Sequence, residues 1–486
     1  MNVNMKTLTR LAFTLSLAAT NAKNLEITLF GAVPDDPSFN VTNKDAINSA
    51  LAAADEGDVV VVPAGTWHLV GGVLAYDLVG VTLQIDGLLN FVADLDHWPQ
   101  GREGSPDYYL NGIELNHGSQ LTVTSSASDG GTLNGNGKLW WNKMLSGALP
   151  AGGCRPRLVS ILNCTDVLVE NLHLINSPEK HLMFNVVRGE VRYVTVLVDR
   201  RYQQDLKQKM REKRLVEHPK LAATVAQAKA SSSTSLFGSP PPPPPSATAS
   251  PSPPGDGNGV AVPPTPWLQP EDLNTDGIDP SGTNIWVHDC SVLNDDDSIA
   301  VKPSGRGTVG QDGTVYDCTQ DVLLENLVLT GFGASVGSVG PSSSNSCVDR
   351  VVFRNLSMPY SGKGVYVKSN ADPCTQEGVT SQLSNILFEG VHVFKPAWWA
   401  VWVGPQQQSE PHEPDSNSGK CSLAYPLVNH CPTQGCADFR NITLKDVVIE
   451  DPLLSPGVLL GNASNPMQVH FDNVTVVKGA NPARGV

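Results

Sequence analysis

The sequence predicts an all-β fold in which short strands stack as the coils of a solenoid. Three observations indicate this fold: one strand-sized pattern recurs seven times, its turn position holds Asn, Asp or Gly, and the composition is rich in turn residues and poor in charge. The 486 residues include 44 Gly and 37 Pro, 17% of them are charged and 40% are hydrophobic. That much apolar surface can form a core, so disorder throughout the chain is excluded.

The recurring unit is a polar residue, a short strand, a polar turn and a second short strand. Its copies begin at Asp166, Asn284, Asp321, Arg350, Asn385, Asn441 and Gln468. Their turns hold Asn171, Asp289, Asn326, Asn355, Gly390, Asp446 and Asn473. Such residues tolerate a left-handed backbone, so stacked copies would form a polar ladder at one corner and columns of Val, Leu and Ile inside. A sandwich of hairpins is the weaker alternative, because hairpin dipeptides such as Asn-Gly do not separate the strands.

The N-terminus predicts a secretory signal and then a cap for the solenoid. Residues 1–22 contain two basic residues, an apolar stretch and a small residue at Ala22, which is typical of a cleaved signal. We therefore expect a secreted, extracellular protein. A short N-terminal helix is expected from Lys44 to about Ala54, capped by Thr42 or Asn43, with an apolar face that covers the first coil. The strand from Val59 to Pro63 would then begin the stack.

The repeat is interrupted once. Residues 201–265 begin with a basic, helix-prone run and continue with Ser, six consecutive prolines and Gly. We interpret this segment as a disordered insertion between two coils, since long loops cost little closure entropy. A partner-binding arm is the alternative. The predicted organisation is therefore a signal at 1–22, β-helix at 23–200, the insertion at 201–265, and β-helix carrying the active site at 266–486.

Charge and apolar runs exclude two classes of partner. The formal net charge is −15 and the pI is near 5.1, so no nucleic-acid partner is expected. Outside the signal, no apolar run approaches the roughly 18 residues of a membrane span, so no membrane association is expected. Six Asn-x-Ser/Thr sequons are consistent with a glycoprotein. We expect a monomer.

Two acidic blocks contain the candidate chemistry. Asn274 to Pro280 reads NTDGIDP, and Asn294 to Lys302 reads NDDDSIAVK. The twenty residues between Asp276 and Asp296 are about one coil, so Asp276 would lie nearly above Asp296 and Asp297. Like charges and burial would keep one carboxyl protonated beside ionised neighbours, which is what glycosidic hydrolysis requires.

Spacing alone leaves two other interpretations of these blocks open. Oxygen-rich clusters also bind Ca²⁺. Acidic residues are also common in turns that have no chemical role. The residues by themselves do not decide among hydrolysis, a Ca²⁺ site and a plain acidic ladder.

Further motifs resemble the polygalacturonase family, glycoside hydrolase family 28, over nearly the whole chain apart from the signal and the insertion. The similar segments are LFGAVPDD from Leu29, VVVVPAGTW from Val59, ILNCTDVLVENLHLINSP from Ile161, the two acidic blocks, and SVGSVG from Ser335. The resemblance implies a single-stranded right-handed parallel β-helix that hydrolyses pectin. A pectic polysaccharide is the implied partner, and no metal or organic cofactor is implied.

The resemblance also implies a role for each matching residue. Asp296 matches the general acid, and Asp276 and Asp297 match the pair that positions and deprotonates the attacking water, with inversion of the anomeric carbon. Asn274 would orient the acidic cluster. Lys302 and Lys368 would supply local cations for an acidic polymer.

Two positions depart from the family pattern. Phe332 stands where the family has His between glycines, and Tyr366 replaces Arg in an Arg-x-Lys motif that ends here at Lys368. Bidentate recognition of a carboxylate is thereby lost, although Tyr366 could stack on a sugar or simply fill a coil. The Trp residues at 398, 399 and 402 could likewise line a sugar cleft or fill the wall.

Three functions therefore stay open. The favoured one is hydrolysis of α-1,4-galacturonosyl linkages. The second is the same chemistry on rhamnogalacturonan, whose neutral rhamnose suits the departures at Phe332 and Tyr366. The third is a pectin-binding β-helix without turnover.

The nine cysteines could form disulfide bonds between residues that are close in the sequence. Cys154 with Cys164, Cys318 with Cys347, and two of Cys421, Cys431 and Cys436 are the expected pairs, although connectivity does not follow from the sequence alone.

Overall fold

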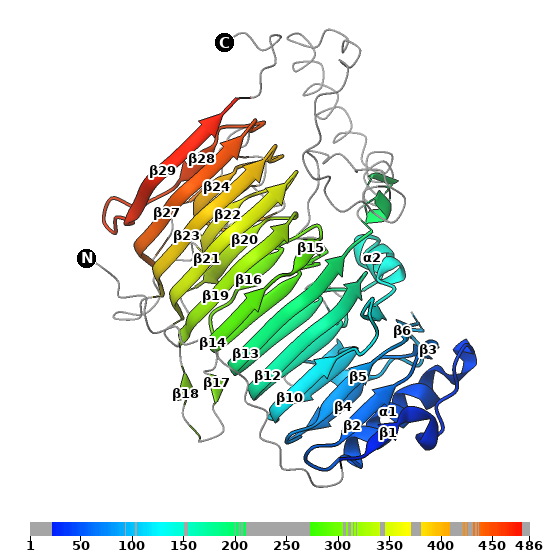
Figure 1. The fold of residues 1–486 in the computed structure, drawn as a ribbon. Coiled ribbons are helices and arrows are strands. Elements are labelled where there is room, and N and C mark those ends of the chain that lie inside the picture. The colour runs from blue at the N-terminus through cyan, green and yellow to red at the C-terminus, as the bar shows by residue number, and fades with distance from the viewer. Residues whose placement is uncertain are drawn as a thin grey trace.

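Short strands of successive coils pair in parallel and build a right-handed parallel β-helix, as the sequence predicts (Figure 1). The computed structural model describes residues 22–478. It leaves out 210–272 and shorter stretches at 93, 103–104, 150–153, 200, 204, 206–207, 305–307, 310–312, 314, 317, 341–345, 371–380, 409–420, 423–424, 426–430, 433–434 and 436. Among the predicted segments, the signal up to residue 21 and most of the insertion therefore lie outside the described residues.

The strands pair in three columns along the helix. The first column, here called the site sheet, contains β4 (Val73–Tyr76), β9 (Ile113–Asn116), the beginnings of β12 (Val159–Ile175), β13 (Leu182–Leu197) and β14 (Ile278–His288), then β16 (Ile299–Val301), β20 (Ala334–Val339), β22 (Val365–Ser369), β24 (Val401–Pro405) and β28 (Gly457–Leu459). This column carries the candidate site.

The second column runs from β1 (Asn24–Glu26) through β2 (Val59–Val62), β5 (Thr82–Ile85), β10 (Ser119–Thr124), the middle of β12 to β14, β19 (Cys318–Leu329), β21 (Cys347–Pro359), β23 (Gln382–Phe394) and β27 (Asp438–Glu450) to β29 (Val469–Val477). The third contains β3 (Thr66–Leu69), β6 (Leu88–Phe91), β11 (Gly131–Asn134), β15 (Ser291–Leu293) and the ends of the long strands. Short pairs outside the columns are β7 (Gln100–Arg102) with β8 (Ser105–Tyr109), β17 (Thr308–Val309) with β18 (Val315–Tyr316), and β25 (Gln407–Gln408) with β26 (Cys421–Ser422).

The predicted corner ladder is present. All seven turn residues have a left-handed backbone, with φ between 52° and 67°. Their side chains bond from coil to coil: Asn326 Nδ2 donates to Asp289 Oδ1 (3.2 Å), and Asn355 Nδ2 donates to Asn326 Oδ1 (2.8 Å). A second left-handed corner, absent from the prediction, lies at the first residue of six of the seven copies, for example Asp166 and Asn284. The two corners bend each long strand from one column to the next.

The N-terminal cap is also present, with different bounds. Helix α1 spans Asn40–Ala52, four residues earlier than expected at its start, and Phe39 is its N-cap. The predicted capping role of Asn43 is wrong, because its side chain is fully buried and bonds the backbone of Val33 and His68 instead. Helix α2 (Lys138–Leu145) and the 3-10 turns η2 (Ile27–Phe30) and η3 (Pro37–Phe39) were not predicted.

The chain leaves and rejoins the stack on consecutive coils around the expected insertion. Strand β13 ends at Leu197 and β14 begins at Ile278, yet the two pair in parallel from Leu182 with Ile278 to Arg192 with His288. The register of the coils therefore continues across the interval.

Two of the expected disulfides are formed. Cys318 bonds Cys347 on the neighbouring coil, and Cys421 bonds Cys431. The predicted Cys154–Cys164 bond is wrong. Cys164 is a thiol that points into the core, where it contacts the carbonyl oxygen of Leu162 (3.2 Å) and where burial raises its pKa to about 11.

Candidate active site

The register of the site sheet stacks one functional residue on each coil. Val159, Leu182, Ile278 and Ile299 are register partners on successive coils, so the residues two positions before them also align. These are Arg157, Lys180, Asp276 and Asp297, here called the site row. Backbone bonds from Leu158 N to Lys180 O, His181 N to Asp276 O, and Gly277 N to Asp297 O confirm the alignment. Asp276 thus stacks on Asp297, whereas the sequence placed it nearly above both Asp296 and Asp297.

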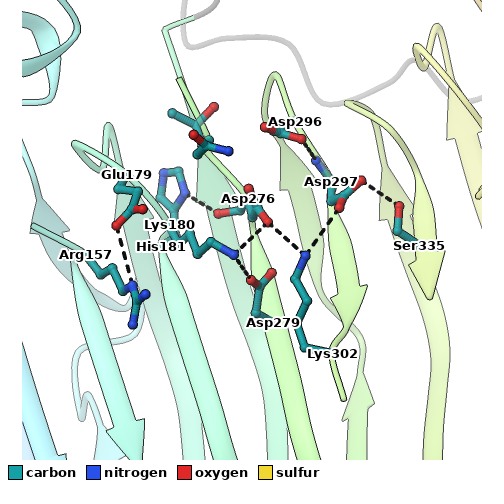
Figure 2. Close-up of polar contacts among 12 residues, drawn as sticks. Arg157, Glu179, Lys180, His181, Asp276, Asp279, Asp296, Asp297, Lys302 and Ser335 are labelled. Carbon is teal, nitrogen blue, oxygen red and sulfur yellow. Dashed lines mark hydrogen bonds and ion pairs between the residues drawn. The ribbon is translucent and has the colours of Figure 1, made fainter. Parts of the chain in front are cut away.

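Asp276 is buried between two lysines. Its Oδ2 lies 3.2 Å from Lys180 Nζ and 3.6 Å from Lys302 Nζ, and the residue is 3% exposed (Figure 2). Burial alone would raise the pKa of Asp276, but Lys180, Lys302 and Lys368 outweigh it and hold the pKa well below its usual range. The three lysines therefore favour the ionised form of Asp276.

Asp297 is held by an equivalent set of donors. Ser335 Oγ donates to Asp297 Oδ1 (2.7 Å), Lys368 Nζ donates to Oδ2, and Lys302 Nζ lies 3.7 Å from the same oxygen. Lys302 thus bridges Asp276 and Asp297 (Figure 2). Two carboxylates joined through one ammonium can position and deprotonate a water molecule.

Asp296 precedes this pair on the same turn and has a different environment. Its Oδ1 accepts the backbone N–H of Asp297 (2.8 Å). The turn is fixed by the fully buried Asn294, whose Nδ2 donates to the carbonyl oxygens of Thr275, Asp296 and Asp297 at 2.8–3.1 Å. One amide therefore ties the backbone of the second acidic block to that of the first.

Asn274 lies beside the cluster rather than over it. Its Oδ1 accepts from Arg155 Nη2 (3.4 Å), and within the described residues its side chain bonds none of the aspartates. The contacts that orient the cluster belong to Asn294, which the sequence interpretation did not single out.

His181 contacts the backbone of Asp276 from the neighbouring coil (Figure 2). Its Nδ1 lies 2.9 Å from the carbonyl oxygen of Asp276, and its Nε2 accepts the backbone N–H of Ser177 (3.2 Å). The neutral tautomer with hydrogen on Nδ1 satisfies both contacts. Burial lowers the pKa of His181 to about 4, only partly opposed by its bond to Asp276.

The sequence interpretation also missed Lys180 and Asp279. Lys180 Nζ lies 2.6 Å from Asp279 Oδ2, so this ammonium bridges Asp279 and Asp276 (Figure 2). Burial raises the pKa of Asp279 to about 6, with Lys180 opposing the shift and Asp276 adding to it. The position of Lys180 in the sequence could have indicated it. Lys180 lies two residues before the start of its strand, as Asp276 and Asp297 do before theirs.

Phe332 and Tyr366, the two departures from the family pattern, lie in a buried aromatic cluster with Trp399 and Trp402. Tyr366 is 1% exposed, and Lys363 Nζ lies 4.2 Å from its ring centroid and 3.7 Å from that of Phe332. Lys368 Nζ lies 4.4 Å from the Tyr366 ring. A ring enclosed in this way has no open face for a sugar, so the structure places Tyr366 in the wall. Of Trp398, Trp399 and Trp402, only Trp398 is partly exposed.

The acidic cluster is neutralised by protein cations. Three lysines contact the carboxylates of Asp276, Asp279 and Asp297. In the part of the chain that the structure describes, no group of three or more His, Cys, Asp and Glu is arranged to hold a metal ion. No helix in that part is long and apolar enough to cross a membrane. The arrangement suits acid–base chemistry, with two clamped carboxylates beside a third carboxyl.

Comparisons with known proteins agree with this class of site. The family model described as glycosyl hydrolases family 28 matches residues 62–201 and 268–405, more than half of the chain. A probable endo-xylogalacturonan hydrolase A from Aspergillus fumigatus is 25% identical over 73% of this chain and 66% of its own length. Endo-xylogalacturonan hydrolase A from Aspergillus tubingensis is 25% identical over 71% of this chain and 62% of its own. The chain thus spans less than two thirds of these curated relatives.

Solved structures show the same fold. The endo-xylogalacturonan hydrolase from Aspergillus tubingensis has a TM-score of 0.58 at 19% identity, covering 94% of both chains. A family 28 exopolygalacturonase from Yersinia enterocolitica has a TM-score of 0.58 at 14% identity, covering 94% of this chain and 72% of that one. The chain belongs to glycosyl hydrolases family 28, and the matched segments contain the whole site row.

Proposed function

We propose that this protein is a secreted glycosidase that hydrolyses α-1,4-galacturonosyl linkages of pectin with inversion. One observation carries the proposal: Asp276 and Asp297 are each clamped by two lysine ammoniums, while Asp296, on the same turn, accepts a backbone N–H. The clamped pair suits the base, and Asp296, which matches the position of the family's general acid, is assigned the acid.

In the proposed reaction, Asp296 donates its proton to the glycosidic oxygen as the bond to the anomeric carbon breaks. Asp276 and Asp297 hold a water on the opposite face of the sugar and accept its proton as its oxygen attacks that carbon. The hydroxyl group enters opposite the leaving group, so the product has inverted configuration. Lys302 lies within 4 Å of both base carboxylates and limits their repulsion.

Xylogalacturonan, a galacturonan that bears xylose, is a substrate of this class that the names of the relatives favour. Rhamnogalacturonan is the second candidate, because Phe332 and Tyr366 provide neither the imidazole nor the guanidinium of the family pattern. The third candidate is a pectin-binding β-helix without turnover.

The test is to incubate the purified full chain separately with polygalacturonate, xylogalacturonan and rhamnogalacturonan, and to count new reducing ends over time. Release from either galacturonan with an acidic optimum, roughly pH 4 to 5, supports the proposal. The first product, observed by NMR before mutarotation, should be the inverted anomer. Release only from rhamnogalacturonan selects the second candidate, and release from none of the three leaves the binding protein.

A further inference from the structure

The lysines of the site are engaged with its own carboxylates. Lys180 contacts Asp276 and Asp279, and Lys302 contacts Asp276 and Asp297. Lys368 donates to Asp297. A polymer of galacturonate brings one carboxylate per sugar, and a cation already committed to a buried aspartate binds it weakly. The substrate charge therefore needs a different partner.

Arg157 is the member of the site row that lies outside this network. It sits two coils from Asp276, and neighbouring parallel strands are about 4.8 Å apart, so it lies about 10 Å along the row. Its side chain is 26% exposed, and its Nε lies 3.5 Å from Glu179 Oε2. Among the described residues, the buried Nε of Arg157 has no hydrogen-bond partner.

The backbone around Arg157 is fixed although its guanidinium is not. Its N–H donates to Asn111 Oδ1 (3.2 Å), and the following residue, Leu158, pairs with the Lys180 carbonyl oxygen (3.0 Å). Figure 2 shows Arg157 and Glu179 beyond Lys180, on the side of the site away from Asp297. The ion pair with Glu179 involves Nε, one of the nitrogens of a guanidinium that has five N–H donors, so a partly exposed Arg157 on a fixed backbone can also bind a second anion.

We propose that Arg157 binds a galacturonate carboxylate of the substrate on the Asp276 side of the scissile bond. A 1,4-linked sugar is comparable in length to the spacing of one coil, about 4.8 Å. A chain lying along the row would bring a carboxylate to Arg157 about two sugars from the unit at Asp276. On the opposite side of the site, the described side chains of Phe332 and Tyr366 are buried aromatic rings and offer no guanidinium. This inference rests on the proposed function and predicts that charge is recognised on the Asp276 side of the scissile bond.

The test compares Arg157→Gln with the full-length wild type on two substrates, de-esterified galacturonan and methyl-esterified galacturonan, whose carboxyl groups are neutral. Loss of a charge-assisted hydrogen bond should raise KM on the de-esterified substrate by about tenfold or more, with kcat nearly unchanged. KM on the esterified substrate should stay within about twofold. Arg157→Lys, which keeps a point charge, should restore part of the affinity.

Two further variants separate binding from structure. Arg440→Gln removes an exposed arginine that pairs with Asp438 on β27, and it should leave both KM values unchanged. Glu179→Gln removes the competing carboxylate, so KM on the de-esterified substrate should fall; this variant carries the test if Arg157→Gln does not fold. An unchanged KM, or equal losses on both substrates, would overturn the inference. A wild-type protein that releases no reducing ends from these two substrates or from xylogalacturonan would instead refute the proposed function.

Discussion

Protonation of His181 should destabilise the candidate site, and its effect can be isolated. The ring is fully buried beneath Asp276, and its pKa is lowered to about 4, first by burial. In the unfolded chain a histidine has a pKa near 6.5. Between pH 6.5 and pH 4 the histidine is protonated in the unfolded state but not in the folded state. The stability that neutral His181 contributes is therefore fully present above pH 6.5 and is lost as the pH falls toward 4.

The magnitude follows from the difference of the two pKa values. A shift from about 6.5 to about 4 corresponds to roughly 3 kcal/mol of unfolding free energy lost between pH 7 and pH 4. His181→Asn keeps a donor for the Asp276 carbonyl oxygen and cannot take up a proton. It loses the acceptor for Ser177, which should cost about 1–2 kcal/mol at every pH. That constant cost cancels when each protein is compared with itself at two pH values.

The assay is urea unfolding of both proteins at pH 7 and at pH 4, followed by tryptophan fluorescence. The wild type should lose about 3 kcal/mol more than His181→Asn over this interval. All other titrating groups are common to both proteins, so they do not enter the difference. Equal losses would show that His181 is not held neutral by burial, and the account of its contact with Asp276 would fail.

Other predictions concern the acid, the base and the wall. Asp296→Asn should lower kcat by about 10²-fold or more with an unchanged circular dichroism spectrum, and an active variant would refute the acid assignment. Lys180→Met should raise the pKa of Asp276, so the acidic limb of the pH–rate profile should move up by about one unit or more; an unmoved limb would contradict the clamp. Phe332→Ala should reduce stability by about 3–5 kcal/mol in thermal or urea unfolding, because the ring is buried against Tyr366, whereas an unchanged midpoint would mean that the wall has repacked. Cys318→Ser should lower stability by about 2–4 kcal/mol under oxidising conditions, and no difference from wild type would mean that the bond to Cys347 does not form in solution.

Local chemistry explains what could be predicted of the fold. A left-handed corner needs Asn, Asp or Gly, so residues such as Asn326 and Asp289 mark each coil in the sequence itself. The second corner was missed because it admits other residues, among them Arg350, whose backbone is left-handed at φ 53°. Helix α2 has no repeat to signal it and was not predicted.

The residues of the candidate site also fall into two groups, those that a local sequence pattern indicates and those that it does not. The blocks around Asp276 and Asp296 are contiguous in sequence, and their carboxylates are a chemical signal that spacing alone can bring together. Lys180 and Arg157 are single basic residues far from both blocks, so nothing local distinguishes them. We expected Asn274 to contact the acidic cluster, but the described contacts are made by Asn294. The direction of a side chain depends on the turn that holds it.

The sequence by itself determined the solenoid, its family and its three aspartates, because periodic turns and clustered carboxylates are local properties. Only the tertiary structure decided which residues meet. The parallel register of β12, β13 and β14 places Arg157 and Lys180 in line with Asp276 across an interval of about eighty residues between β13 and β14. It also buries Tyr366 in the wall. Register is set by many backbone hydrogen bonds acting together, which no single motif records.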